Sequence, residues 1–103
     1  MFMKADLILT SEGEIDNAYI FINDPDQQDK LWFQPESSIK WKISNIEVGG
    51  EDALQYRLKV KAYFGTKFKC MISREDEKEI AIEGITGSEN TAILTGTRVF
   101  QNE

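Results

Sequence analysis

The stretch LQYRLKVKAYF, residues 54–64, alternates between apolar and polar side chains along most of its length. Its even positions are all apolar: Leu54, Tyr56, Leu58, Val60, Ala62 and Phe64. The odd positions between them are Gln55, Arg57, Lys59, Lys61 and Tyr63. Alternation with a period of two indicates a β-strand with one buried face and one face in solvent. We therefore predict that this stretch is the longest strand of an antiparallel domain and that the other segments pair around it.

The next segment, residues 67–72, alternates in the same way, with Phe68, Cys70 and Ile72 as its apolar face. A two-residue loop would set apolar side chains opposite lysines, whereas a loop of three or five residues sets apolar side chains opposite each other. The sequence therefore predicts a hairpin in this second register. Its predicted pairs are Phe64 with Phe68, Ala62 with Cys70 and Val60 with Ile72.

Five further segments have the alternation or composition of β-strands: residues 3–9, 15–22, 39–48, 80–82 and 92–100. The polar turn at residues 11–14 predicts a hairpin between the first two. Residues 18–22 are apolar at every position, which predicts a strand covered on both faces. In the third segment the apolar parity changes near Ser44 and Asn45, which predicts a β-bulge.

The least regular part of the chain follows the second segment. Asp24, Pro25 and Gln27 have the order of an N-cap, a first helical residue and a capping-box partner, and Pro35 would end a helix that begins there. We predict one short helix that carries residues 31–33 to the rim of the sheet. A long ordered loop is the alternative.

These segments amount to about seven or eight strands. We predict an all-β fold, or a mainly β fold with one short helix, in a single antiparallel domain that spans residues 1–103. The strands would form a meander that closes into a small barrel or packs as two sheets. The charged run at residues 74–79 predicts a connection rather than a helix, because it is too short and too polar on all sides for a stable helix.

The composition excludes several chemistries. The chain has no histidine, which removes the usual general base near neutral pH, the commonest zinc ligand and the Ser-His and Cys-His dyads. We therefore expect no enzymatic activity, no cofactor and no metal. A net charge of −6 disfavours a surface that binds nucleic acid or anionic membrane everywhere. With one cysteine and no signal peptide or membrane-spanning run, a cytoplasmic location is expected, with Cys70 as a buried thiol.

The polar face of the predicted hairpin is basic. In the predicted register it gathers Arg57, Lys59, Lys61 and Lys69 with Tyr63, and the preceding strand can add Lys40 and Lys42. Lysines beside an aromatic ring on a sheet can hold single-stranded nucleic acid or phosphates. The face therefore predicts an anion-binding site. The alternative is an ordinary solvated face, on which lysines discourage edge pairing.

The aromatic residues near the irregular segment are the other candidates. Trp32 and Phe33 are predicted to form an exposed aromatic contact, whereas Trp41, flanked by isoleucines, is predicted to lie in the core. Together with Tyr19, these rings could instead line a cavity for an apolar ligand.

Acidic residues lie mainly in the predicted turns and loops. Asp24, Asp26 and Asp29 lack the glycine and the terminal glutamate of a calcium loop, and helix capping accounts for the first two. The remaining acidic turns could bind a basic partner, or they could serve only solubility.

Three functions follow from these patterns. The first prediction is a non-enzymatic protein-binding module, such as an inhibitor, an immunity-type partner or an assembly subunit. The alternatives are binding of single-stranded nucleic acid or another anionic ligand on the basic face, and a small barrel that holds an apolar ligand. The oligomeric state is left open. The candidate binding residues are Arg57, Lys59, Lys61, Tyr63, Lys69, Trp32 and Phe33.

Overall fold

The computed structural model of the chain describes residues 2–22, 30–49 and 52–102. Ten β-strands and one 3₁₀ turn lie in these residues. The strands are β1 (Phe2–Ser11), β2 (Ile15–Ile22), β3 (Leu31–Trp32), β4 (Gln34–Pro35), β5 (Lys40–Gly49), β6 (Ala53–Ala62), β7 (Lys67–Arg74), β8 (Lys78–Ile85), β9 (Thr91–Val99) and β10 (Gln101–Asn102). The 3₁₀ turn η1 (Ser88–Asn90) connects β8 to β9. The predicted all-β class is therefore confirmed.

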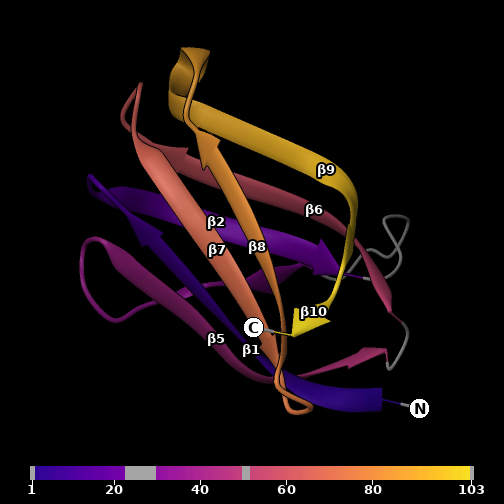
Figure 1. Cartoon of the computed structure of the whole chain (residues 1–103). Helices are drawn as coiled ribbons and strands as arrows, with labels where there is room; N and C mark the ends of the chain where they lie inside the picture. The colour runs from indigo at the N-terminus through magenta and orange to yellow at the C-terminus, as the bar shows by residue number, and fades with distance from the viewer. Residues whose placement is uncertain (1, 23–29, 50–51, 103) are drawn as a thin grey trace.

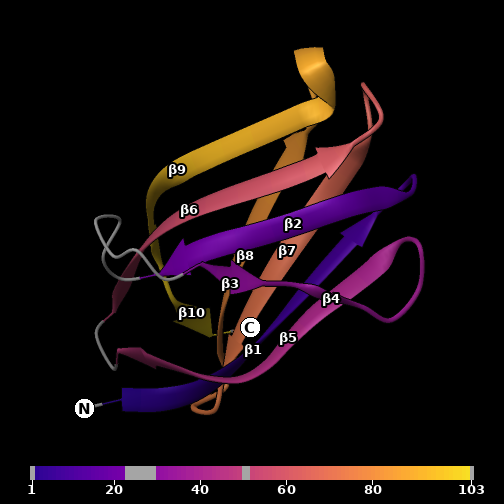
Figure 2. The same cartoon turned by 180° about the vertical axis from the view of Figure 1, so that it is seen from behind.

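The strands form two antiparallel sheets that pack against each other (Figure 1). Sheet A has six strands in the order β10-β8-β7-β1-β5-β4, and sheet B has four strands in the order β3-β2-β6-β9. From behind, the strands of sheet B run across those of sheet A at a steep angle (Figure 2). Of the two predicted arrangements, the chain thus adopts two packed sheets.

The chain changes sheet at most of its turns. β1 lies in sheet A and β2 in sheet B, and the same change occurs between β5 and β6, between β6 and β7, and between β8 and β9. Two hairpin predictions are therefore wrong. The turn at residues 11–14 connects the two sheets. β6 pairs with β2 and β9 rather than with β7, whose neighbours are β1 and β8.

The turn after β6 carries the chain from sheet B to sheet A. The backbone N–H of Gly65 donates to the carbonyl of Thr86 at 2.9 Å, and the N–H of Thr66 donates to the Thr86 hydroxyl at 2.9 Å. The Thr86 hydroxyl in turn donates to the carbonyl of Tyr63 at 2.6 Å. Because Thr66 and Thr86 are buried, breaking these bonds would leave unsatisfied polar groups. The turn is therefore tied to the segment after β8.

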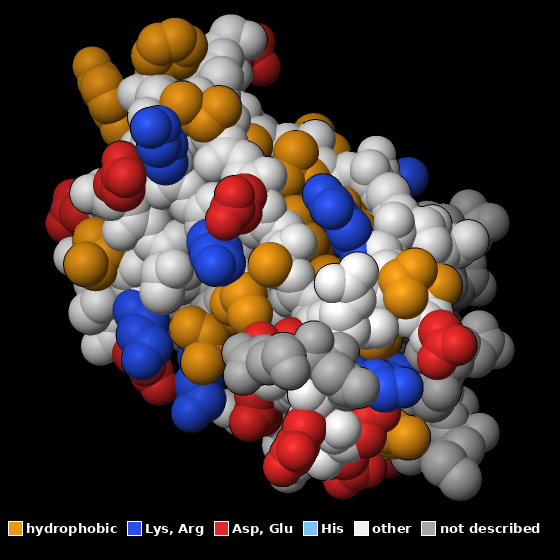
Figure 3. Space-filling model, viewed as in Figure 1, with side chains coloured by type: hydrophobic (Ala, Val, Ile, Leu, Met, Phe, Trp, Pro, Cys, Tyr) orange, Lys and Arg blue, Asp and Glu red, His pale blue; other side chains and the backbone are white. Residues whose placement is uncertain are grey.

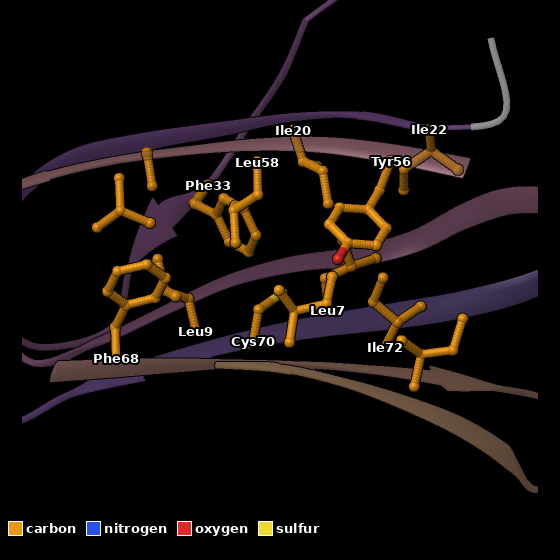
Figure 4. Packing of buried hydrophobic residues seen from close by; sticks show 14 of the residues in the cluster. Leu7, Leu9, Ile20, Ile22, Phe33, Tyr56, Leu58, Phe68, Cys70 and Ile72 are labelled. Atoms are coloured by element: carbon orange, nitrogen blue, oxygen red, sulfur yellow. The ribbon is translucent and has the colours of Figure 1, made fainter. Parts of the chain in front are cut away.

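The predicted alternation on β6 and β7 is confirmed, although the pairing is not. The buried residues of the two strands include Leu54, Tyr56, Leu58, Val60 and Ala62 on β6 and Phe68, Cys70 and Ile72 on β7. In the core, Leu58 and Tyr56 point toward Cys70 and Ile72 from the opposite side (Figure 4). The two apolar faces, predicted to lie side by side in one sheet, are therefore stacked across the core.

Phe64 does not belong to this core, contrary to the prediction. β6 ends at Ala62, and the side chain of Phe64 is 63% exposed. Its backbone N–H donates to the Asn90 side-chain carbonyl at 3.0 Å. The alternation of inward and outward side chains stops where the turn begins, so the last apolar residue of the pattern faces solvent.

The predicted bulge in β5 is confirmed. Between Ala5 and Leu7 of β1, the register against β5 shifts. Asn45 lies at this shift with a φ of 63°, and its N–H donates to the carboxylate of Asp6 at 2.9 Å. The bulge keeps the apolar residues on both sides of it directed toward the core.

The predicted helix is wrong for residues 31–33, which are extended. β3 pairs with β2, and β4 pairs with β5. Residues 23–29, which carry the predicted helix start, lie outside the described residues. Neighbouring side chains of an extended segment point to opposite sides. Accordingly, Trp32 is 49% exposed, whereas Phe33 is only 2% exposed, and the prediction of an exposed Phe33 is also wrong.

Two further predictions concern partly buried aromatic residues. One face of β2 is buried through Ala18 and Ile20, but Tyr19 and Phe21 on its other face are only half-buried. The predicted cover on both faces is therefore incomplete. Trp41 packs against the core as predicted, although part of its side chain remains accessible.

The charged run at residues 74–79 forms the end of β7, a tight turn and the start of β8, and its first residue is buried. Arg74 continues the inward parity of β7, and its guanidinium carbon lies 4.1 Å from the centre of the Phe100 ring. Its Nε and Nη2 donate to the two carboxylate oxygens of Asp76 at 2.9 and 2.7 Å. These charge-assisted hydrogen bonds from Arg74 hold the pKa of Asp76 below its usual range. The predicted connection without a helix is therefore confirmed, and Arg74 at its start is buried.

Candidate binding face on sheet B

The outer face of sheet B carries a row of side chains that crosses all four strands. Trp32 of β3 lies opposite Tyr19 of β2. Tyr19 lies opposite Lys59 of β6, which in turn lies opposite Ile93 of β9. Directly opposed residues have Cβ atoms about 4.5–5.5 Å apart. The row therefore places two aromatic rings, an ammonium group and an aliphatic side chain side by side.

The neighbouring positions extend this surface. Phe21 of β2 pairs with Arg57 of β6, and Lys61 continues the basic line on β6. The Tyr19 ring meets the Phe21 ring edge-on with centroids 5.6 Å apart, and it meets the Trp32 ring at 5.2 Å. Edge-to-face contacts of this kind orient the rings. We define the aromatic–cationic face as Tyr19, Phe21, Lys30, Trp32, Arg57, Lys59 and Lys61.

Two ammonium groups lie close to the rings of this face. The Nζ of Lys30 is 4.8 Å from the Tyr19 centroid and 5.8 Å from the Trp32 centroid. The Nζ of Lys59 is 5.7 Å from the Tyr19 centroid. At exposed sites each such contact is worth about 0.5–1 kcal/mol. The contacts hold the positive charges close above an apolar surface.

The cations that β6 contributes to this face differ from most other lysines of the described chain in having no carboxylate partner there. Within the described residues, Arg57, Lys59 and Lys61 form no ion pair with a carboxylate. The four strands of sheet B contain one acidic residue, Asp16, against Arg57, Lys59, Lys61 and Arg98. A chain of net charge −6 thus presents a locally positive surface.

The lysines on the outer face of sheet A are in a different setting. Its ion pairs join Lys4 to Glu47 at 3.7 Å, Lys40 and Lys42 to Glu36 at 3.6 Å each, and Lys69 to Glu83 at 3.9 Å. Basic and acidic side chains lie next to one another on the side of the molecule that carries β7 and β8 (Figure 3). The predicted single basic face is therefore two faces, and on sheet A the four lysines Lys4, Lys40, Lys42 and Lys69 each lie beside a carboxylate.

The seven predicted binding residues have separate fates. Four share the outer face of sheet B: Arg57, Lys59, Lys61 and Trp32. Lys69 does not join them, because β7 belongs to sheet A. Phe33 is buried in the core. Tyr63 lies beyond the end of β6 in the turn, where its side chain is 78% exposed.

Sequence reasoning missed Phe21 and Lys30 and assigned Tyr19 to a cavity. The continuous apolar run at residues 18–22 held the necessary signal. On a strand with one face in the core, an aromatic residue of the opposite parity must lie on the surface. Lys30 had no such signal, because its place over Tyr19 depends on the pairing of β3 with β2.

Two open hollows lie on the described surface. One of about 590 Å³ lies over sheet A and is lined in part by Lys69 and Glu83. The other, of about 460 Å³, is lined in part by Ile43 and by Trp32, which belongs to the aromatic–cationic face. Because both hollows are open to solvent, neither favours the hypothesis of a barrel that encloses an apolar ligand.

The described part of the chain also bears on metal binding, membrane insertion and thiol chemistry. No group of three or more His, Cys, Asp or Glu side chains there is placed to hold a metal ion. No helix in the same residues has the length and apolar character needed to cross a membrane. Cys70 is buried as predicted, and burial raises the pKa of its thiol to about 12. The thiol therefore stays protonated near neutral pH and is a poor nucleophile.

Comparisons of the chain with protein-family models, with curated proteins and with solved structures give no significant match. The fold and the aromatic–cationic face define a small two-sheet β-domain with one chemically distinctive surface. Function is therefore inferred from the geometry of that surface alone.

Proposed function

We propose that this protein is a non-enzymatic binding module, and that the aromatic–cationic face of sheet B is its docking surface for an acidic partner protein. One observation carries the proposal. On a chain of net charge −6, three cations of β6 that form no ion pair within the described residues lie beside the aromatic rings of β2. An acidic partner would be attracted to this face and repelled by the acidic turns, which favours one orientation of docking.

The spacing of the cations favours a partner of opposite charge. Arg57, Lys59 and Lys61 occupy successive outward positions of β6. Like charges at neighbouring positions of a sheet repel each other. Carboxylates of a partner would relieve this repulsion on binding. They would not have to displace an existing ion pair, because these cations form none within the described residues.

The aromatic residues favour a protein partner in particular. Trp, Tyr and Arg are the side chains that most often dominate the energy of protein–protein interfaces. Trp32 is 49% exposed and is held by its contact with Tyr19. A ring that is oriented in advance loses little conformational entropy on binding. Trp32 is therefore the expected energetic centre of the interface.

The test compares charge reversals on the two sheets. Arg57→Glu with Lys59→Glu alters the aromatic–cationic face, and Lys4→Glu with Lys69→Glu makes the same change in net charge on sheet A. A photo-crosslinking amino acid at position 55, the exposed outward position next to Arg57 on β6, captures the partner from native lysate, and mass spectrometry identifies it. Titrations with the purified partner then measure affinity.

We expect the sheet B variant to bind the partner at least about tenfold more weakly, a loss of roughly 1.4 kcal/mol. The sheet A variant should bind like the unmodified chain. Equal losses in both variants would show that net charge, rather than this face, governs binding and would overturn the proposal. A captured protein with a basic contact surface would also contradict it.

Single-stranded nucleic acid is the second candidate, favoured by the registry of rings and cations across β3, β2 and β6. Bases can stack on the rings while phosphates contact the lysines. Fluorescence anisotropy with labelled oligonucleotides tests it. When affinity depends on phosphate contacts, the logarithm of the binding constant falls linearly with the logarithm of the salt concentration. Salt-dependent binding that Arg57→Glu with Lys59→Glu abolishes would favour nucleic acid over protein. Absence of binding at low salt would exclude it.

A further inference from the structure

The edges of the two sheets differ in how they are protected. Three edges end in strands of two residues, namely β3, β4 and β10, and β4 contains Pro35. The remaining edge is formed by β9, which has nine residues. Sheets usually protect their edges with short strands, prolines, bulges or charges. β9 has no proline and no register shift against β6, and Arg98 is its one charged residue.

The hydrogen bonds of β9 show which backbone groups point to this edge. The N–H of Phe100 donates to the carbonyl of Asp52 at 2.8 Å. In an antiparallel ladder, hydrogen-bonded and non-hydrogen-bonded pairs alternate, so the even-numbered residues of β9 bond to β6. The residues that direct their N–H and C=O groups away from β6 are therefore Ile93, Thr95, Thr97 and Val99. No other strand in the described residues pairs with this side of β9.

The edge is open over most of its length. All of residues 95–99 are exposed, whichever side of the sheet they face. On the outer face, Ile93 is 60% exposed and Val99 is 56% exposed. β9 diverges from β8 beyond the turn that joins them (Figure 1). A further strand can therefore approach β9 from this side.

We propose that β9 pairs antiparallel with β9 of a second copy of this chain, with Ile93 of each copy opposite Val99 of the other. A two-fold axis through Gly96 generates this register and pairs Thr95 of each copy with Thr97 of the other. A two-fold interface must be complementary to itself. β9 meets this condition because its two exposed aliphatic residues lie at equal distances along the strand from Gly96.

The size of the interface determines the expected strength of the dimer. Seven paired residues, 93–99, span about 24 Å of strand. A ladder of this length with two Ile–Val contacts falls at the small end of specific interfaces, so the dimer should dissociate on dilution. Pairing would join the two copies of sheet B into one continuous sheet. Both aromatic–cationic faces would then lie on the same side of this sheet. The dimer is argued from the edge of β9 alone, so it does not depend on the proposed function.

The test removes one backbone donor from the edge. Thr95→Pro deletes an N–H that points away from β6, which is the position at which an edge strand tolerates proline. Thr95→Ser is the matched control, because it keeps the N–H. Molar mass is measured by light scattering over a wide concentration range, and urea unfolding checks the fold. We expect the mass of the unmodified chain and of Thr95→Ser to double with concentration, while Thr95→Pro stays monomeric.

A second variant guards against a folding defect in Thr95→Pro. Ile93→Glu with Val99→Glu leaves the backbone intact, sets a carboxylate opposite Lys59 within the chain and places like charges opposite one another in the dimer, so it should also be monomeric. An unmodified chain that remains monomeric at its highest soluble concentration overturns the proposal. A dimer that survives both variants overturns it as well, because it would use another surface.

The register has its own test. Ile93→Cys combined with Val99→Cys should form intermolecular disulfides under mild oxidation, because the two positions face each other in the dimer. Each single variant should crosslink far more slowly, since identical positions lie six residues apart along the paired strands. Equally fast crosslinking of a single variant would overturn the register.

Discussion

The outer faces of the two sheets carry the same kind of cation in opposite settings. On sheet A, Lys4, Lys40, Lys42 and Lys69 each lie between 3.6 and 3.9 Å from a carboxylate oxygen. On sheet B, the cations of β6 have no such neighbour among the described residues and instead lie beside aromatic rings. Exposed ion pairs contribute little to stability. The difference therefore concerns what each face can bind more than how the chain folds.

The comparison also shows how little a net charge says about a surface. The value of −6 sums a face of paired lysines and carboxylates on sheet A, a positive face on sheet B and acidic turns. Association depends on the local potential at the contact rather than on the sum. A protein that appears acidic in composition can therefore attract an acidic partner, provided that its acidic residues are kept away from the docking face.

Substitutions of the two tryptophans test whether the outer face of sheet B serves binding rather than folding, and they have the largest expected effects. Trp41→Ala should lower the free energy of unfolding by about 2–4 kcal/mol, because Trp41 packs against the core. Trp32→Ala should lower it by about 1 kcal/mol or less, since its main loss is the contact with Tyr19. In partner binding the order reverses, and Trp32→Ala should cost about 2 kcal/mol. Urea denaturation and partner titration measure the two quantities.

Trp41→Phe is the matched control for the core residue. The indole N–H of Trp41 is buried without a hydrogen-bond partner among the described residues, so its removal breaks no bond there. The expected loss in unfolding free energy is below about 1.5 kcal/mol. If Trp32→Ala destabilised the fold as much as Trp41→Ala, the assignment of Trp32 to an exposed binding face would be wrong.

Local patterns predicted which way side chains point, and the parity change near Ser44 and Asn45 predicted the bulge. They could not predict which strands pair. A hairpin and a crossover between stacked sheets both bury Leu58 and Cys70, so the alternation is the same in either case. In the crossover the turn after β6 is held by buried threonine hydrogen bonds, which the alternation does not reveal. They join residues that are far apart in the sequence.

The same limitation explains the errors in the candidate site. Lys59 and Lys69 have the same parity on consecutive strands, but the strands belong to different sheets. Trp32 and Phe33 were expected to be exposed together, which a helix end would allow. In an extended segment they face opposite sides. The other rings on the surface, Tyr19 and Phe21, come from the apolar run that was predicted to be covered on both faces.

The next prediction concerns Arg74, a buried cation of sheet A, and its hydrogen-bond partner Asp76. Hydrogen bonds from Arg74 lower the pKa of Asp76. A lowered folded-state pKa contributes stability above the unfolded value of about 3.9, and this contribution is lost as the pH falls through the folded-state pKa. Asp76→Asn should therefore be less stable than the unmodified chain at pH 7, and the difference should shrink below about pH 4. Urea midpoints between pH 7 and pH 2 measure it.

Glu83→Gln is the comparison for Asp76→Asn. Glu83 pairs with Lys69 at 3.9 Å, and both side chains are largely exposed. Screening by water makes such a pair weak, so the stability of Glu83→Gln should follow that of the unmodified chain at every pH. An Asp76→Asn difference that stayed constant down to pH 2 would show that ionisation of Asp76 does not support the fold.

The smallest expected effects are on the free energy of unfolding when one lysine on each outer face is replaced by glutamate. Lys69→Glu replaces an ion pair with two neighbouring carboxylates and should lower the free energy of unfolding by about 0.5–1 kcal/mol. Lys59→Glu loses a weak contact with Tyr19 but relieves repulsion from Arg57 and Lys61, so its expected change is within about 0.5 kcal/mol of zero. Urea denaturation at low and high salt measures both variants.

Salt should reduce the difference between these two variants, because it screens the repulsion created by Lys69→Glu and the repulsion relieved by Lys59→Glu. Both variants exchange a lysine for a glutamate on a strand and change the net charge equally. The difference between them therefore reports the local environment of each lysine. A larger loss for Lys59→Glu than for Lys69→Glu would mean that the cations of sheet B are stabilised within the chain, and the case for an external acidic partner would lose its basis.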